Sequence, residues 1–369
     1  MKRTLLLLAA AAGLWSSCGD APAGLSELQP TFVSPSMTPD SLRALLSDAY
    51  DAGTFNGAVV ICRDGDIAFE EYYGVESASG DTLTRTSAFR LASLSKAYTA
   101  AGILRLCEQG KLDLDGPVQA VMSDFPYADV TPRHLLNHTS GIGDLYLELA
   151  TVYEDSLGPV LTIDEVVGLV NADLMPKRAA GDTMVYSNTG YVFAAGLIQH
   201  VSGQSFEDFM RTELFEPMGM TNTRVWNLVS ADSTFEGKTT GFEWIQGQRV
   251  PVEPMWMDGV AGDGAVFSCG ADLVKWERFW WQGNPAINDE LLKAAFANVT
   301  TTAGDTTGYG FGWDLGEGVQ FHTGGWLSAA TYILRIPSER VMAVAYSNAG
   351  EDAMNDIILA IDQALGVEE

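Results

Sequence analysis

Three short motifs in this 369-residue chain combine residue types that can carry out acyl transfer through a serine. They follow one another in the order Ser93-Leu94-Ser95-Lys96, Tyr186-Ser187-Asn188 and His322-Thr323-Gly324. Such a reaction needs a serine that can be activated, groups that carry a proton, and backbone N–H groups that stabilise an oxyanion. Each motif alone is common, so the ordered set of three is the feature that predicts a function.

Lys96 is expected on the apolar side of a helix that begins near Ser93. At about 100° per residue, Lys96 shares a stripe with Ala100, Ile103 and Cys107. Burial there favours the neutral amine, which can accept the Ser93 hydroxyl proton. Ser93 lies one turn earlier, where the free N–H groups of a helix start favour negative charge. The alternative is an ordinary helix with Lys96 reaching solvent and Ser93 as its N-cap.

The second motif occurs twice, so a choice between the two copies is needed. The copy at Tyr346-Ser347-Asn348 closes an apolar run typical of a buried strand, which indicates a structural role. The copy at Tyr186-Ser187-Asn188 lies in a loop before a helix, where polar side chains can project into a cleft. We therefore choose Tyr186.

The third motif also has a second candidate. Lys238-Thr239-Thr240-Gly241 resembles a Lys-Thr-Gly triad with one residue too many. His322-Thr323-Gly324-Gly325 lies instead where one expected strand ends and the next begins. Glycines there would let a substrate backbone approach closely and leave an N–H free for an oxyanion. A single His is more often a packing residue, so His322 gains weight only from the other motifs.

Charge and composition exclude several classes of partner. The formal net charge is −27, with 21 Lys and Arg against 48 Asp and Glu. Nucleic acids and anionic membrane surfaces need an excess of cations, so neither is expected to bind. The four scattered His form no metal-binding motif, and we expect neither a metal nor a cofactor. Beyond Cys18 the cysteines are odd in number, which predicts buried thiols at Cys62, Cys107 and Cys269.

The N-terminus is typical of an export signal. Lys2 and Arg3 precede an apolar run over 5–14 that is too short to span a bilayer. Cys18 follows small residues and resembles the lipidated Cys of a bacterial lipobox, although Trp15 stands where Leu is usual. We expect a signal peptide over 1–17 and a tether over 18–39. The protein would then be periplasmic and touch a membrane only through lipid on Cys18, or it would be secreted.

The elements that must position the motifs fall at both ends of the chain and between them. Strands are expected over 57–62, 67–73, 308–315, 319–322, 328–336 and 341–347, with helices over 39–52 and 352–365. This order predicts an α/β (α+β) fold with one sheet built from both ends. The sheet region would comprise about 40–92 and 270–366, with an inserted, mainly helical lobe over about 93–269.

Together these residues resemble the serine β-lactamase and penicillin-binding protein superfamily, in its class C-like branch. That branch has Tyr-x-Asn as its middle motif, and His often replaces the Lys of the Lys-Thr-Gly motif. The stretches 135–142, 215–220 and 266–273 are also family-like, so the resemblance covers a single domain over about 40–366. It implies an antiparallel sheet flanked by helices, with an inserted helical lobe.

The resemblance also implies roles for the motif residues. Ser93 would be the nucleophile, with Lys96 and Tyr186 sharing proton transfer and the base in each step left open. Substrate would be bound by Asn188, His322, Thr323 and Gly324. Asn188 would hold the substrate amide or Lys96. The N–H groups of Ser93 and Gly325 would form the oxyanion hole, in a monomer that takes a small-molecule or peptide substrate.

Two departures from the family pattern affect the expected substrate. His322 in place of Lys removes a fixed cation for a substrate carboxylate, and Asp263 would repel carboxylates if it borders the cleft. We therefore expect an esterase or a D-amino-acid peptidase or carboxypeptidase, ahead of a true class C β-lactamase. The alternative is a catalytically silent penicillin-recognising or peptidoglycan-binding lipoprotein. An α/β-hydrolase is disfavoured, since the chain has no Gly-x-Ser-x-Gly elbow.

Overall fold

The computed structural model describes residues 37–78, 80–144, 159–173, 178–229, 234–281, 283 and 285–367. The expected signal peptide, Cys18 and nearly all of the tether lie outside these residues. Among the residues described, no helix is long and apolar enough to cross a bilayer. The expected free thiols are confirmed at Cys62, Cys107 and Cys269, of which Cys107 is only partly buried.

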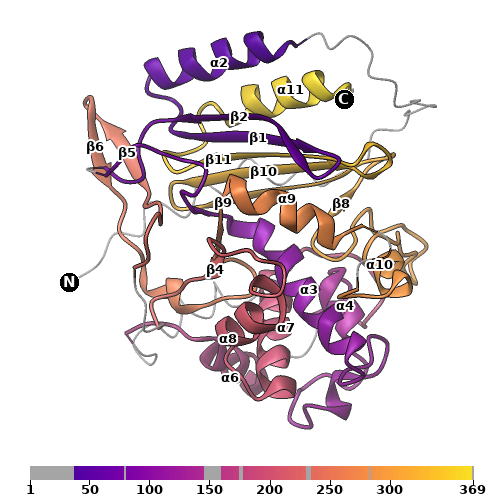
Figure 1. Cartoon of the computed structure of the whole chain (residues 1–369). Helices are drawn as coiled ribbons and strands as arrows, with labels where there is room; N and C mark the ends of the chain where they lie inside the picture. The colour runs from indigo at the N-terminus through magenta and orange to yellow at the C-terminus, as the bar shows by residue number, and fades with distance from the viewer. Residues whose placement is uncertain are drawn as a thin grey trace.

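A six-stranded antiparallel sheet built from both ends of the chain forms the centre of the fold (Figure 1), which confirms the predicted architecture. Its strands lie in the order β2-β1-β11-β10-β9-β8. They are β1 (Gly57–Arg63), β2 (Asp66–Tyr73), β8 (Asp314–Leu315), β9 (Gln320–Trp326), β10 (Ala329–Ile336) and β11 (Val341–Ser347). The two ends of the chain meet where β1 pairs with β11, for example Val59 with Ala345.

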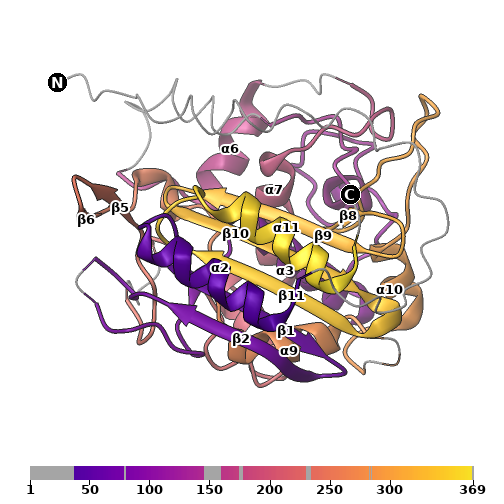
Figure 2. The same cartoon turned by 90° about the horizontal axis from the view of Figure 1, so that it is seen from above.

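Alternate side chains of the sheet face two hydrophobic cores, as the two-residue period of a strand requires. Val59 and Ile61 pack with the helices α2 (Pro39–Asp51) and α11 (Met354–Leu365), which cover one face of the sheet (Figure 2). Val60 and Cys62 belong to the core on the opposite face. That core also contains side chains of α3 (Ser95–Glu108) and α9 (Gly270–Phe279).

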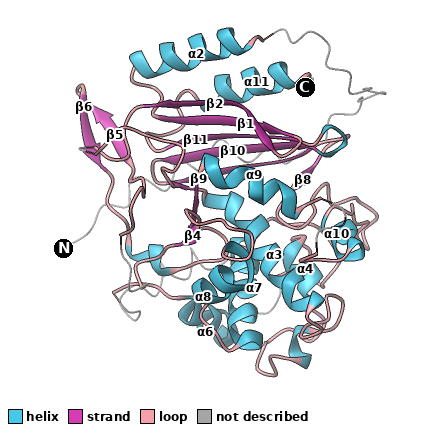
Figure 3. Cartoon of the chain, viewed as in Figure 1, coloured by secondary structure: helices cyan, strands magenta, loops and turns pink. Residues whose placement is uncertain are grey.

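A mainly helical lobe extends from the second face of the sheet (Figure 3). Its helices are α4 (Pro132–Leu136), α6 (Ile163–Asp173), α7 (Asn188–Ser202) and α8 (Phe206–Met210), with α10 (Asp289–Ala295) nearby. Short strands accompany them: β3 (Phe89–Arg90), β4 (Arg224–Val225) and β7 (Val266–Ser268) form one small sheet, and β5 (Phe242–Ile245) and β6 (Gln248–Pro251) form a hairpin. Helix α3 packs against α7, so its first turn lies at the boundary between sheet and lobe.

Two sequence predictions about strands are wrong. The strand expected over 308–315 forms only as β8, because Gly308 and Gly312 have φ of +60° and +79°, which no extended strand allows. The third motif lies inside β9 rather than between two strands, since Gly325 pairs with Ala330. The turn follows at Leu327 and Ser328.

Candidate active site

Ser93 is presented by a sharp turn between β3 and α3. Ala92 has a φ of +48°, a backbone conformation that residues other than glycine rarely adopt. Such conformations are frequent at functional sites. The turn is fixed from two sides. The Leu91 N–H donates to the Val266 carbonyl at 2.9 Å, and the Thr331 hydroxyl donates to the Leu91 carbonyl at 2.9 Å. The position of Ser93 therefore depends on both β7 and β10.

Lys96 is fully buried, as predicted, and its Nζ atom reaches three oxygen atoms. They are Ser93 Oγ at 3.2 Å, Asn188 Oδ1 at 2.7 Å and the Asp263 carbonyl at 3.0 Å. An ammonium would donate to all three. A neutral amine would donate to Asn188 and Asp263 and accept the Ser93 hydroxyl proton. Both charge states of Lys96 are therefore satisfied without rearrangement, as a group that exchanges a proton with Ser93 requires.

Tyr186 lies against the same Lys96 side chain. Lys96 Nζ is 4.9 Å from the centroid of the Tyr186 ring, and that ring is 6.2 Å from the His322 ring. Tyr186 directly precedes Ser187, the N-cap of α7, whose hydroxyl accepts the Gly190 N–H at 3.0 Å. The start of α7 thereby brings the second motif to Lys96.

Asp144 is a site residue that sequence reasoning missed. Its carboxylate accepts the N–H of Asn188 at 3.0 Å, the side-chain amide of Asn188 at 2.8 Å and the N–H of Thr189 at 3.2 Å. Burial raises the pKa of Asp144, while the bonds from Asn188 and Thr189 oppose this. Because Asp144 holds the amide nitrogen, Asn188 presents its oxygen to Lys96. The family-like stretch 135–142, which ends two residues earlier, was the available indication.

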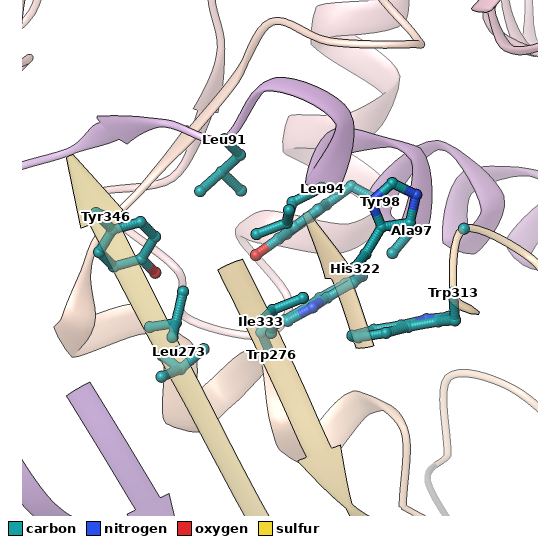
Figure 4. A pocket seen from close by; sticks show the side chains of 12 residues that line it. Leu91, Leu94, Ala97, Tyr98, Leu273, Trp276, Trp313, His322, Ile333 and Tyr346 are labelled. Atoms are coloured by element: carbon teal, nitrogen blue, oxygen red, sulfur yellow. The ribbon is translucent and has the colours of Figure 1, made fainter. Parts of the chain in front are cut away.

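His322 is buried, and its ring nitrogens both have partners within the protein. Nδ1 is 2.5 Å from the Thr323 carbonyl and must carry the hydrogen, so Nε2 accepts the Tyr309 hydroxyl at 2.9 Å. Desolvation, followed by the charge of Lys96, lowers the pKa of His322 to about 3. The ring lines a small enclosed cavity with Tyr98 and Trp313 (Figure 4). Because its pKa is about 3, the His322 ring is neutral at pH 7.

The cleft above Ser93 contains only part of the predicted set. Its lining includes Ser93, Asn188, Gly325, Asp263, Arg90 and Trp326. Ser93 and Gly325 share this cleft, as an oxyanion hole made from their N–H groups requires. Gly324 packs against the Ser93 turn. Thr323 alternates with His322 along β9, so its side chain lies on the other face of the strand.

The two alternative motif copies that sequence analysis did not choose, at Tyr346 and at Lys238, lie outside the Ser93 cleft. The structural interpretation of Tyr346 is confirmed, since it is 2 % exposed within β11. His138 is also buried and accepts the Ser187 N–H at Nδ1 over 3.1 Å. Lys238 lies outside the Ser93 cleft, and its Nζ is 3.7 Å from the centroid of the Trp226 ring.

The low pKa of His322 predicts stability that falls in acid. The unfolded chain binds this proton near pH 6.5, whereas the folded chain binds it only near pH 3. The stabilisation is therefore fully present above pH 6.5 and is lost as pH falls toward 3. From pH 7 to pH 4 the loss from this residue is about 3 kcal/mol. The free energy of unfolding in urea should be measured at pH 7 and at pH 4. Its decrease between the two pH values should be smaller in His322→Gln than in the wild type by about this amount. Equal differences in the two proteins would contradict a buried neutral His322.

Comparisons with known proteins identify relatives over most of this chain. A family model described as Beta-lactamase matches residues 42–368. Penicillin-binding protein 4* of Bacillus subtilis (strain 168) is 34 % identical over 326 residues, which cover 84 % of this chain and 72 % of that protein. D-aminopeptidase of Gluconobacter oxydans (strain 621H) is 26 % identical over 84 % of this chain and 59 % of that protein.

Solved structures share the fold. The octameric penicillin-binding protein homologue from Pyrococcus abyssi has a TM-score of 0.72 at 25 % identity, over 88 % of this chain and 78 % of that one. The D-amino acid amidase from Ochrobactrum anthropi SV3 has a TM-score of 0.69 at 23 % identity, over 89 % and 97 % of the two chains. Because the family model spans the whole sheet and lobe, the chain belongs to the beta-lactamase family of serine hydrolases.

Proposed function

We propose that this protein hydrolyses an ester or an amide through an acyl-enzyme on Ser93, and that the leaving group of its substrate is uncharged. The observation that carries the proposal is the 3.2 Å contact between Ser93 Oγ and the buried Nζ of Lys96, an amine whose other contacts suit both of its charge states. A general base must first lie within hydrogen-bond reach of its proton, and Lys96 does.

The proposed reaction uses the contacts of the site. Ser93 Oγ attacks the substrate carbonyl carbon while Lys96 takes the hydroxyl proton. The carbonyl oxygen becomes negative between the N–H groups of Ser93 and Gly325. The leaving group departs with a proton supplied by Lys96 or Tyr186. A water molecule then attacks the ester and gives its proton to the same pair, and Ser93 leaves with its hydroxyl restored.

The neutral His322 is the reason to expect an uncharged leaving group. In β-lactams and D-alanyl-D-alanine peptides, a carboxylate lies close to the nitrogen that is displaced when Ser93 attacks the carbonyl carbon. The neutral His322 provides no fixed cation to receive that charge. Esterase and D-amino-acid peptidase activities are therefore favoured over carboxypeptidase and β-lactamase activities. The D-aminopeptidase among the relatives supports this order.

Covalent labelling tests the acyl-enzyme directly. Intact mass after treatment with a fluorophosphonate should show one adduct, and peptide mapping should place it on Ser93. Rates are then compared for p-nitrophenyl butyrate, D-alanine p-nitroanilide, nitrocefin and a D-alanyl-D-alanine peptide. We expect the first two to exceed the others by about tenfold or more in kcat/KM. An unlabelled wild type would contradict the mechanism and favour a catalytically silent penicillin-recognising or peptidoglycan-binding protein.

A further inference from the structure

A second pocket continues from the Ser93 cleft past Arg90 and Trp326, which line both. It lies beyond the C-terminal end of β9, where the 327–328 turn faces residues 238–241. Its apolar walls include Trp226, Phe267, Val252 and Pro254. Lys238 stands among these walls, and we call this space the Lys238 pocket.

The Lys238 pocket is cationic in a protein whose net charge is −27. The Lys238 ammonium lies 3.7 Å from the Trp226 ring centroid, and within the described part of the chain it has no hydrogen bond or ion pair. Arg90 pairs with the buried carboxylate of Asp258 at 2.5 Å, and that carboxylate also accepts the Trp326 indole N–H at 2.8 Å. Two cations and one anion leave the pocket with one net positive charge.

Two buried polar atoms beside this pocket lack a partner among the residues that the structure describes. They are Arg90 Nε and Ser328 Oγ, and Ser328 is only 3 % exposed. Both residues line the Lys238 pocket. Buried donors are normally satisfied, so unpartnered ones beside two cations indicate a site for a group with several acceptor oxygens.

We propose that the Lys238 pocket binds a carboxylate carried by the acyl part of the substrate, several bonds away from the carbonyl that Ser93 attacks. The inference rests on the proposed acyl-enzyme function. It also gives a role to Lys238, which took no part in the chemistry at Ser93.

The position of the pocket assigns the carboxylate to the acyl part. Tyr186, one of the two groups proposed to give the leaving group its proton, lies beside His322. His322 and Trp326 are four residues apart in β9, a distance of about 13 Å along the strand. A leaving group that takes its proton beside Tyr186 is therefore at the opposite end of the site from Lys238. The group at Lys238 stays on Ser93.

Asp263 sets the length of the acyl part. It lines the Ser93 cleft but not the Lys238 pocket. A carboxylate close to the reacting carbonyl would lie near Asp263 and be repelled by it. A carboxylate on a longer acyl chain would extend beyond Asp263 and reach Lys238. Desolvation, followed by the charge of Arg90, lowers the pKa of Lys238 to about 8, and a bound carboxylate would offset both effects.

Matched ester pairs test the proposal. The p-nitrophenyl monoesters of succinic, adipic and suberic acid are each compared with their own methyl esters, and the ratio of kcat/KM within a pair is measured. We expect the acid to exceed its methyl ester in kcat/KM by a ratio of about 10 or more for the adipate or suberate pair. For the succinate pair we expect a ratio smaller than this. Lys238→Gln should lower the high ratio about tenfold, whereas Lys238→Arg should retain most of it. The exposed Lys111, changed in Lys111→Gln, is the matched control and should leave the ratio unchanged.

The outcomes separate this proposal from the function on which it rests. If Ser93 is labelled and methyl esters are hydrolysed, but no acid exceeds its methyl ester, the pocket proposal is overturned and the acyl-enzyme stands. If the wild type is neither labelled nor active, calorimetric titration of Ser93→Ala with monomethyl adipate tests carboxylate binding at the Lys238 pocket independently of catalysis. Binding weakened about tenfold by an added Lys238→Gln supports the site, and equal binding in both proteins overturns it.

Discussion

Ser93→Ala is expected to lower kcat/KM for the best substrate by about 10⁴-fold or more and to abolish labelling by a fluorophosphonate. The variant lacks the atom that forms the acyl bond in the proposed reaction, Ser93 Oγ, which Lys96 Nζ contacts at 3.2 Å. Loss of one partly exposed hydroxyl should leave the fold unchanged. Initial rates, intact mass and circular dichroism check the three parts of this expectation.

Ser95→Ala is the matched control, because Ser95 belongs to the same motif. Its hydroxyl is buried, accepts the Val266 N–H at 3.0 Å, and does not contact Lys96 Nζ. This variant should lose stability, by about 1 to 3 kcal/mol, since a buried N–H loses its partner. It should still be labelled at Ser93. Labelling of Ser93→Ala, or full turnover by it, would place the nucleophile elsewhere.

Gly324→Ala is expected to lower both stability and activity, by displacing the turn that carries Ser93. A Cβ atom at this position would lie 2.5 Å from Thr331 Oγ1, 2.6 Å from the Leu91 carbonyl and 3.0 Å from the Ser93 nitrogen. Strand β9 or the turn must therefore move. Overpacking of this kind costs about 1 to 3 kcal/mol. A shift of about 1 Å at a reacting group costs about 100-fold in rate.

Gly325→Ala provides the comparison for this change. A Cβ atom at Gly325 would have nothing within 4 Å, so the variant should unfold in urea within about 0.5 kcal/mol of the wild type. The rate of phosphonate labelling reports on the Ser93 turn in Gly324→Ala. Wild-type stability and labelling in that variant would contradict the close approach of β9 to Ser93.

Local patterns in the sequence were sufficient to predict much of this molecule. The helical stripe placed Lys96 on a buried face, and the alternating strands at both ends placed the sheet. Both inferences use neighbours within a few residues, where the periods of helix and strand apply. The same periods failed at Gly308 and Gly312, because the backbone conformation of a glycine is not fixed by its neighbours.

The rest of the site depends on contacts between distant parts of the chain. Asp144 holds Asn188 from another loop, and Tyr309 turns the His322 ring into an acceptor from outside β9. The positive φ of Ala92 exists because β7 and β10 hold the turn around it. No short-range pattern reports such contacts, so the sequence indicated which residues could react but not what orients them.

The pairing of β1 with β11 has a consequence for how the protein is made. Val59, near the start of the domain, needs Ala345, near its end, to complete the sheet. During synthesis the edge of β1 that pairs with β11 stays unpaired until β11 has been made, and an unpaired strand edge is a site of aggregation. The Ser93 turn waits as well, since Thr331 of β10 holds Leu91. Ser93 thus gains this support only once β10 has been made, and a chain that ends before β10 lacks the contact between Thr331 and Leu91.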